Sequence, residues 1–393
     1  MKILVVHNDY GRYSGEEAVV DHMIADLRAR GHEVDSLRRS SQHHRDTLWG
    51  NIRGFFAGIY SLSGRRMMRS KLHSFQPDVI NIHNLYPFIS PAVLPICRRA
   101  GVPVVMTVHN YRLICPTGLF LRDGMPCENC LRNGNERDCI RYNCEHSRLR
   151  SLGYALRNAA ARHTKAYIRN VNIFCCLTEF QRQKLIAAGF DATKIVVIPN
   201  YIEPFTGSDT LLTTPCSSRS VAYVGRLSEE KGCDILLEVA RRHPEIPFRF
   251  AGTLREEFTA PSLPNVTLCG QLDRQALQQL YADSLFVVIP SRCYEGFPVA
   301  LLEASSMGRC SIAPDHGAFR DLMTDRTSDE LCGLLFTPLD VDDLEEKVVR
   351  LWNDTTLADS LGDKARKNYN ERFLKETITA SWDALLQKTA TTR

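Results

Sequence analysis

The chain reads Pro290-Ser-Arg-Cys-Tyr-Glu295-Gly-Phe-Pro-Val-Ala-Leu-Leu-Glu303 where an apolar run gives way to a helical pattern. The apolar run just before it, Leu285–Ile289, is typical of a buried strand. Gly296 lets the backbone turn back, and Pro298 suits the first position of the following helix. A strand-to-helix turn of this kind points free backbone amides out of the sheet, where the helix dipole favours an anion such as phosphate.

Two glutamates, Glu295 and Glu303, stand eight positions apart in this segment. At a helical rise of about 1.5 Å per residue they would lie roughly 12 Å apart. A glycosidase pair needs its two carboxylates about 5–9.5 Å apart, so the spacing favours one carboxylate at each end of an extended nucleotide-sugar. The simpler interpretation is two solvated helix charges. The preceding strand, the glycine and a second motif upstream favour the site.

The second motif is Gly225-Arg226-Leu-Ser-Glu-Glu-Lys231-Gly232. It follows the short apolar run Ser220–Val224 and precedes the amphipathic pattern Cys233–Arg241, so it also forms a strand-to-helix turn. Arg226 offers a planar fork of donors and Lys231 a compact charge, and both can converge on one diphosphate. The alternative is an ordinary basic loop.

Together these motifs resemble the GT-B retaining glycosyltransferases of family 4, along nearly the whole chain. Thr107-Val-His109-Asn110 and Val197-Ile-Pro-Asn200 also fall in the family's order. The resemblance implies an α/β fold of two Rossmann-like, doubly wound domains that face each other across a cleft, with the nucleotide held mainly by the second. One segment departs from the family, which commonly has a glycine pair and a Pro-Glu where this chain has His316-Gly317-Ala-Phe-Arg-Asp321, so its donor contacts stay open.

The resemblance also implies roles for particular residues. Arg226 and Lys231 would hold the diphosphate, Glu295 would contact the donor sugar, and Glu303 would bond the ribose hydroxyls. His109 would lie near the donor sugar and the reaction centre. The expected catalytic set is Glu295, His109, Arg226 and Lys231, and the expected donor-binding set is Gly15, Arg226, Lys231, Glu295, Gly296, Phe297, Val299 and Glu303.

The mechanism implied by the resemblance is a retaining transfer by front-face displacement, in which the leaving phosphate itself deprotonates the acceptor. A covalent intermediate stays open as the alternative. Arg226 and Lys231 would neutralise the departing diphosphate, and Glu295 would orient the sugar. Asp340-Val-Asp342 could suggest a metal site, but its position before a helical pattern indicates a helix cap. We expect no catalytic metal.

Length and pattern predict two domains. The 393 residues suffice for two or three cores, and strands alternate with helical patterns, as in parallel βαβ units. We expect an N-terminal domain at 1–200, a linker at 201–219, a C-terminal domain at 220–372 and a helix at 373–393 that crosses back to the first domain. The expected strands are Lys2–His7, Val34–Leu37, Asp78–His83, Val102–His109, Ile173–Leu177, Lys194–Ile198, Val221–Val224, Pro247–Ala251, Val266–Cys269, Leu285–Ile289, Cys310–Ala313 and Gly333–Phe336.

Composition bounds the class of protein. Charged residues make up 24% and hydrophobic residues 44% of the chain, as in soluble globular proteins. The net charge of +4 gives no case for nucleic acid as a partner. The apolar start, Met1–His7, is too short for a signal peptide, and no run approaches the roughly 18–20 apolar residues of a membrane span. We therefore expect a cytoplasmic protein whose 14 cysteines are thiols or metal ligands.

Two features of the N-terminal half suggest that ligands bind at one edge of its sheet. The loop Asn8–Gly15 follows the first strand and opens onto a helix, so it should lie at the carboxyl edge of the sheet, and Gly15 can approach the donor phosphates closely. The alternative is an ordinary turn, because many turns without a binding role have the same glycine spacing. His83 and His109 each close an apolar strand. A structural role is the better interpretation for His83, and a site role for His109.

Cysteines gather in an insertion at residues 111–147. Cys127 and Cys130 form a C-x2-C pair, and Cys139 and Cys144 follow. Four thiolates in a cytosolic loop with few apolar residues suit a structural tetrahedral zinc, which would offset the entropy of ordering the loop. Free thiols that pack against the domain, or redox-labile cysteines, are the alternatives. The family carries a comparable insertion, which leaves the metal unidentified.

A stretch from Arg45 to Ser74 combines aromatic and basic residues. Trp49, Ile52, Phe55, Phe56, Ile59 and Tyr60 recur at helical intervals before Arg65, Arg66, Arg69 and Lys71. Such a stripe could rest on the inner face of an anionic membrane and bring a lipid-linked acceptor to the enzyme. A core-facing helix with a solvated basic end is the simpler interpretation.

We therefore expect an enzyme that transfers sugar from a UDP- or GDP-sugar to a saccharide or lipid-linked acceptor, in surface polysaccharide or glycolipid synthesis. Two alternatives from other classes stay open. One is a GT-B nucleotide-sugar epimerase, which would turn over donor without an acceptor. The other is a non-catalytic zinc-bearing binding module, which would not need Glu295.

Overall fold

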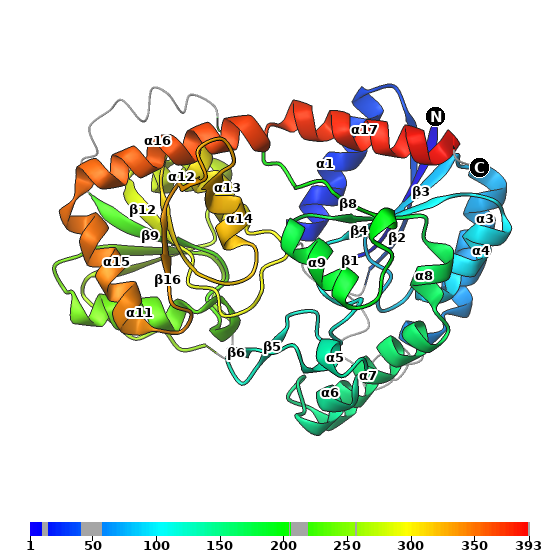
Figure 1. Ribbon diagram of the computed structural model, residues 1–393, viewed down its shortest axis with the longest axis horizontal. Coiled ribbons are helices and arrows are strands. Elements are labelled where there is room, and N and C mark those ends of the chain that lie inside the picture. The colour runs from blue at the N-terminus through cyan, green and yellow to red at the C-terminus, as the bar shows by residue number, and fades with distance from the viewer. Residues whose placement is uncertain (10–14, 41–56, 204, 206–218, 256–257, 392–393) are drawn as a thin grey trace. The chain divides into compact units, whose positions relative to one another are not determined.

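A computed structural model describes residues 1–9, 15–40, 57–203, 205, 219–255 and 258–391 (Figure 1). The chain divides into two compact units. Unit 1 comprises Met1–Phe120, Glu128–Asn200 and Glu376–Arg393, and unit 2 comprises Leu121–Cys127 and Tyr201–Lys375. Each unit is an α/β layer structure built around its own parallel sheet.

Unit 1 contains a six-stranded sheet in the order β2-β1-β3-β4-β7-β8, and every neighbouring pair in it is parallel. Its strands are β1 (Lys2–Asp9), β2 (Glu33–Ser40), β3 (Val79–Ile82), β4 (Val104–Val108), β7 (Ile173–Cys176) and β8 (Ile195–Val197). The central strands are buried along their whole length because helices cover both faces, which explains their unbroken apolar runs. The strand order reverses direction between β1 and β3.

The helices of unit 1 follow the strands in βαβ fashion. They are α1 (Gly15–Ala29), α3 (Leu62–Phe75), α4 (Leu94–Arg99), α5 (Asn129–Arg132), α6 (Arg137–Arg141), α7 (Arg148–His163), α8 (Ala166–Asn170), α9 (Glu179–Ala187) and α17 (Lys375–Thr391), with 3-10 turns η1 (Pro91–Val93) and η2 (Ala192–Lys194). Arg30 and His32 hydrogen-bond Thr379 and Asp383 of α17, which fixes the C-terminal helix within this unit.

Unit 2 contains a second parallel sheet in the order β11-β10-β9-β12-β13-β16. Its strands are β9 (Ser220–Val224), β10 (Phe248–Ala251), β11 (Val266–Gly270), β12 (Ser284–Val288), β13 (Ser311–Pro314) and β16 (Leu334–Phe336). In order of appearance this is 3-2-1-4-5-6, the doubly wound order of dinucleotide-binding folds. The order reverses between β9 and β12, and ligands of such sheets bind outside the carboxyl ends of the strands at that point.

The helices of unit 2 enclose an apolar core that includes Phe248, Phe250 and Phe286, all almost fully buried. They are α11 (Cys233–Arg242), α12 (Arg274–Ala282), α13 (Val299–Ser306), α14 (Phe319–Met323), α15 (Val341–Asn353) and α16 (Thr355–Arg372), with the 3-10 turn η3 (Glu229–Lys231). Asp340 caps α15 by accepting from the backbone amides of Asp342 and Asp343, which confirms the helix cap predicted for this segment.

All twelve predicted strands are present, with ends shifted by no more than a few residues. Two short hairpins were not predicted, β5 (Leu121–Arg122) with β6 (Met125–Pro126) and β14 (Thr324–Asp325) with β15 (Glu330–Leu331), because their strands are too short to show a period. The units also differ from the expected boundaries, because Leu121–Cys127 groups with unit 2 although it lies inside the first domain in sequence.

Candidate functional site

The two predicted motifs meet at the strand-order reversal of unit 2. The segment with Arg226 and Lys231 follows β9, and the segment with Glu295 follows β12, the strand next to β9 in the sheet. Helices that leave neighbouring strands in opposite directions open a space at their carboxyl ends. The sheet order therefore brings together side chains that are 64 positions apart in sequence, such as Lys231 and Glu295.

A glycine sets how closely these two segments approach. Gly232 has φ of +67°, and a Cβ placed on it would lie 1.9 Å from the carbonyl oxygen of Pro290. The backbone amide of Arg292 also donates to the carbonyl of Glu230 at 3.1 Å. Only glycine fits both the backbone conformation and the space, so this residue holds the two loops in register.

Lys231 and Glu295 form a two-pronged ion pair. Lys231 Nζ lies 2.7 Å from Glu295 Oε1 and 2.9 Å from Oε2, and Ser291 Oγ donates to Oε1 at 2.6 Å. Burial is the largest single effect and would raise the pKa of Glu295, but the charge and hydrogen bonds of Lys231, the hydroxyl of Ser291 and the charge of Arg226 together hold this pKa below its usual value. Burial would lower the pKa of Lys231, and Glu295 holds it above its usual value. Both groups are therefore ionised at neutral pH.

Arg226 keeps its guanidinium accessible beside this pair. Its side chain is 44% exposed, and Nη2 lies 3.3 Å from Glu230 Oε1. The hydroxyl of Tyr223 donates to the backbone carbonyl of Arg226 at 2.6 Å, which fixes the start of the turn. The arginine thus supplies a positive charge that an anionic ligand can reach.

Glu303 lies within α13, and its environment differs from that of Glu295. Tyr281 donates its hydroxyl to Glu303 Oε2 at 2.8 Å, and burial raises the pKa of this carboxyl despite that hydrogen bond. Pro298 is the N-cap of α13 and not its first residue. The helical rise per residue therefore applies only from Val299 onward. The expected separation of roughly 12 Å between the two glutamates treated the whole segment as helical, which is wrong for the residues before Val299.

The remaining predicted donor residues of unit 2 lie between these glutamates. Gly296 and the buried Phe297 form the turn, and Val299 opens α13. The ring of Phe297 meets Phe373 edge-on, with 6.2 Å between centroids, so this side chain packs the turn against the end of α16. Its contribution to a donor site would come from the backbone.

Ser291 and His316 belong to this region and were not predicted as site residues. Ser291 holds Glu295 through its hydroxyl, and its carbonyl oxygen lies 3.0 Å from His316 Nε2. The segment that departs from the family pattern therefore lies directly against the loop after β12. No pattern in the sequence indicated that these two residues belong to the site, because a serine and a histidine on separate loops have no characteristic spacing.

In unit 1, His109 lies just after β4, and His83 lies just after the neighbouring β3. His83 Nδ1 lies 2.7 Å from His109 Nε2, and the rings stack at 5.1 Å with 22° between their planes. Burial lowers the pKa of His109 to about 4 and that of His83 well below its usual value. The sequence indicated only a structural role for His83, and this pairing was not predicted.

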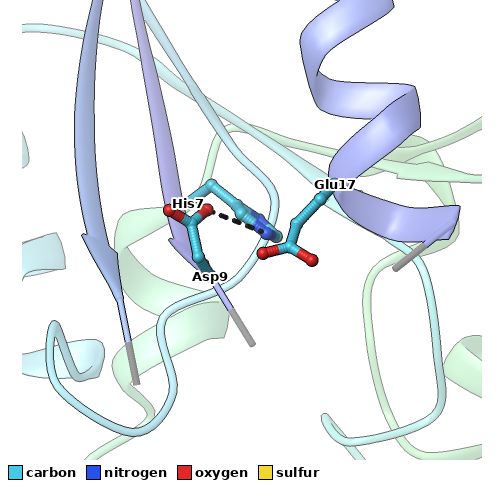
Figure 2. Close-up of side chains that lie close together, drawn as sticks. All are labelled: His7, Asp9 and Glu17. Atoms are coloured by element: carbon cyan, nitrogen blue, oxygen red, sulfur yellow. Dashed lines mark ion pairs between the residues drawn. The ribbon is translucent and has the colours of Figure 1, made fainter. Parts of the chain in front are cut away.

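A third histidine joins the same edge with two carboxylates. Figure 2 shows His7 of β1 beside Asp9 and Glu17, the one group in the described residues whose metal-ligating atoms all lie within 4.8 Å of one another. His7 Nε2 is 3.7 Å from Asp9 Oδ1, and burial lowers the pKa of this histidine. Arg38 donates to Asp9 Oδ1 through Nε at 3.0 Å and Nη2 at 2.8 Å, so a guanidinium already supplies positive charge to this carboxylate.

Gly15 is the first residue of α1, and a Cβ there would meet no atom within 4 Å. Its position at a helix N-terminus agrees with the predicted place, but the space around it does not require glycine. Most of the predicted loop Asn8–Gly15 lies outside the described residues, as do Trp49, Ile52, Phe55 and Phe56 of the predicted aromatic stripe. In the basic part of that stretch, Arg65 donates to the carbonyl of Ala92 and Lys71 pairs with Asp35.

The predicted set of four cysteines is divided between the two units. Cys127 belongs to unit 2, whereas Cys130, Cys139 and Cys144 belong to unit 1. A hydrogen bond with the thiol of Cys144 is the largest effect that raises the pKa of Cys139. Burial and the nearby thiols of Cys130 and Cys115 raise this pKa further. Four thiolates around zinc lie roughly 3.8 Å apart, and no three of these sulfurs lie within 4.8 Å among the described residues. These side chains are therefore not arranged as a tetrahedral zinc site, and zinc at these cysteines stays a prediction.

We propose that zinc in this insertion takes Cys115 in place of Cys127, because Cys115 lies in unit 1 with Cys130 and Cys144 and acts on the thiol of Cys139. The expected result is about one zinc per chain in the wild type, unchanged in Cys127→Ser and strongly reduced in Cys115→Ser. Metal content is measured by mass spectrometry of protein purified without a chelating column. A wild type with only trace zinc, or equal loss in both variants, contradicts the proposal.

No helix within the described ranges is both long and apolar enough to cross a membrane. Comparison with protein-family models gives two matches. Residues 13–204 match Glycosyltransferase Family 4, and residues 218–354 match Glycosyl transferases group 1.

Two curated relatives are distant in sequence. Poly(ribitol-phosphate) alpha-N-acetylglucosaminyltransferase of Staphylococcus aureus (strain COL) is 24% identical over 54% of this chain and 43% of its own length. Alpha-D-kanosaminyltransferase of Streptomyces kanamyceticus is 25% identical over 77% of this chain and 72% of its own length. The chain therefore spans less than half of the first relative and more than two thirds of the second.

Solved structures resemble the chain over its full length. Sucrose-phosphate synthase of Thermosynechococcus elongatus superposes with a TM-score of 0.72 at 16% identity, and the match covers 100% of both chains. HepE of Anabaena in complex with UDP-glucose gives 0.66 at 17% identity and covers 99% of this chain and 100% of that one. At such identities the likeness shows the fold alone.

Proposed function

The chain belongs to the family 4 (group 1) glycosyltransferases and has their GT-B fold of two Rossmann-like domains, and from this premise we propose that it transfers a sugar from a nucleotide-diphosphate-sugar to a saccharide or lipid-linked acceptor, with retention at the anomeric carbon. The donor is a UDP- or GDP-sugar, and the product belongs to a surface polysaccharide or glycolipid. Its relatives from Staphylococcus and Streptomyces are themselves named as glycosyltransferases. Membership in this class of enzymes sets aside the binding-module alternative.

One observation supports the donor site above all others. Lys231 has three N–H donors, of which two reach the carboxylate of Glu295 at 2.7 and 2.9 Å. The third remains for a phosphate oxygen, and the exposed guanidinium of Arg226 begins the same loop. A diphosphate bound at Arg226 and Lys231 would therefore lie next to the carboxylate that touches the sugar.

The proposed reaction uses position and charge. Arg226 and Lys231 stabilise the negative charge that develops on the leaving diphosphate, and Glu295, held by Lys231 and Ser291, orients the sugar. The second carboxylate oxygen of Glu303, which Tyr281 does not occupy, accepts from the ribose hydroxyls. A phosphate oxygen of the leaving group takes the proton of the acceptor hydroxyl, so no protein base is required.

The test is a donor screen. UDP-, GDP- and other nucleotide-sugars are compared by the shift in melting temperature and by release of the nucleoside diphosphate, with and without an acceptor. We expect one nucleotide class to raise the melting temperature and its sugar to be transferred with retained configuration. Binding of no nucleotide-sugar would overturn the proposal, and epimerised donor formed without acceptor would favour the epimerase.

Lys231→Met is expected to weaken binding of the matching nucleoside diphosphate by about 10-fold or more, because a charge-assisted hydrogen bond is worth roughly 1.5–3 kcal/mol. Binding of the nucleoside monophosphate should change much less, since the base and ribose are held elsewhere. Titration calorimetry with both ligands measures the difference. Lys364→Met, which removes an exposed lysine paired with Glu330, is the control. Equal losses for monophosphate and diphosphate would place Lys231 outside the diphosphate site.

A further inference from the structure

Three histidines end three neighbouring strands of the unit 1 sheet. His7 lies on β1, His83 follows β3 and His109 follows β4, and these strands are adjacent in the sheet order. The carboxyl ends of parallel strands meet at one edge of the sheet, so the three rings lie together there. His83 is the middle one, stacked on His109 and edge-on to His7 at 6.4 Å between centroids.

The pair His83 and His109 shares one hydrogen bond. The 2.7 Å separation of His83 Nδ1 and His109 Nε2 is that of a short N–H···N bond, so one nitrogen donates and the other accepts. Burial keeps both rings neutral at pH 7, since it lowers both pKa values and no carboxylate offsets it in either. His7 and Arg38 also face His83 and disfavour its charged form. Each ring therefore carries a single proton.

The surroundings of His83 decide where that proton lies. His83 is only 4% exposed, and its Nε2 is buried without a hydrogen-bond partner in the described part of the chain. A buried N–H group without an acceptor is rarer and costlier than a lone pair without a donor. The proton of His83 therefore lies on Nδ1, which donates to His109. Because Nε2 of His109 accepts, the proton of His109 lies on its Nδ1.

We propose that His83 is a positioning residue that holds His109 as its Nδ1–H tautomer, so that His109 presents an N–H donor to an oxygen of a sugar bound at this edge of the unit 1 sheet. This inference rests on the proposed function, in which the ligands of this chain are sugars. Nδ1 of His109 makes no hydrogen bond to any described residue, so this atom remains for a ligand. The tautomer matters because an N–H group bonds a sugar oxygen as the donor and so orients the sugar for transfer, whereas a lone pair would require that oxygen to donate instead.

The matched variants are His83→Asn and His83→Leu. The amide nitrogen of asparagine takes about the place of Nδ1 and can donate, whereas leucine has a similar shape without a donor. We expect His83→Leu to lower kcat for sugar transfer by about 10- to 100-fold, as loss of an orienting partner does in metal sites, with a smaller change in the donor KM. His83→Asn should restore most of kcat. Equal rates in His83→Leu and the wild type would overturn the proposal.

The tautomer itself is read without any substrate. Long-range proton–nitrogen correlation spectra of protein labelled with ¹⁵N-histidine distinguish Nδ1–H from Nε2–H, and the signals absent from His109→Gln assign His109. We expect Nδ1–H in the wild type and in His83→Asn, and loss of this pure tautomer in His83→Leu. Nε2–H in the wild type overturns the inference even where leucine prevents folding. Absence of transfer from every nucleotide-sugar would instead refute the proposed function, and the spectra would still decide the tautomer.

Discussion

Glu295→Gln is expected to lower kcat for sugar transfer by about 100-fold or more while nucleotide binding survives, an effect of the size seen when one stabilising group leaves an active site. Glutamine keeps the size of the side chain and an oxygen that Ser291 can reach, but it carries no charge. The variant therefore removes the negative charge that pairs with Lys231 and that the proposed mechanism uses to orient the sugar, without opening a cavity. Glu295→Ala should abolish transfer and in addition leave Lys231 without its counter-ion.

The measurement pairs initial rates of transfer with titration of the nucleoside diphosphate. Glu238→Gln is the control, because Glu238 lies on α11 of the same unit, pairs with Arg241 and Arg242 and takes no part in the proposed site. We expect its rate to equal that of the wild type. Normal transfer by Glu295→Gln would remove Glu295 from the proposed mechanism, and loss of nucleotide binding would show a role in the fold of the loop.

Gly232→Ala is expected to destabilise the protein by roughly 3 kcal/mol or more, the range of substitutions that force an atom into occupied space. The added Cβ would lie 1.9 Å from the carbonyl oxygen of Pro290, a contact with backbone that no side-chain rotation relieves. The residue also has φ of +67°, which alone costs an alanine about 1–2 kcal/mol. Since the loops with Lys231 and Glu295 meet here, nucleotide binding should weaken as well.

Gly270→Ala separates the two costs. Gly270 has φ of +66°, and a Cβ added to it would meet no atom within 4 Å, so only the backbone penalty applies. The midpoints of urea unfolding of both variants are compared under identical conditions. We expect the Gly232 variant to lose clearly more stability than the Gly270 variant. Equal losses would show that the loops separate easily and that Gly232 does not set their distance.

The strands were predictable because their signal is local. Every strand of both sheets was expected from short apolar runs bounded by turn residues, and the capping role of Asp340 followed from its position before a helical pattern. The two loops of the candidate site were recognisable for a related reason. Arg226 and Lys231 lie within six positions of each other, and Glu295 lies on a turn whose glycine and proline mark it.

Contacts between segments distant in sequence were not predictable. The pairing of His83 with His109 requires that β3 and β4 be neighbours, and neither strand contains that information. The grouping of Cys127 with unit 2, and the nearness of Cys115 to Cys139, likewise depend on the path of the insertion. Ser291 and His316 share no spacing that would have connected them.

The sequence by itself determined the α/β class, the positions of the strands and the two loops that hold basic and acidic residues, because hydrophobic period and turn chemistry act over a few residues. Only the tertiary structure decided that the loop after β9 meets the loop after β12, so that Lys231 binds Glu295. The physical reason is that strand order is set by packing of the whole sheet. A lysine and a glutamate 64 positions apart become an ion pair only when the reversal of that order lies between their strands.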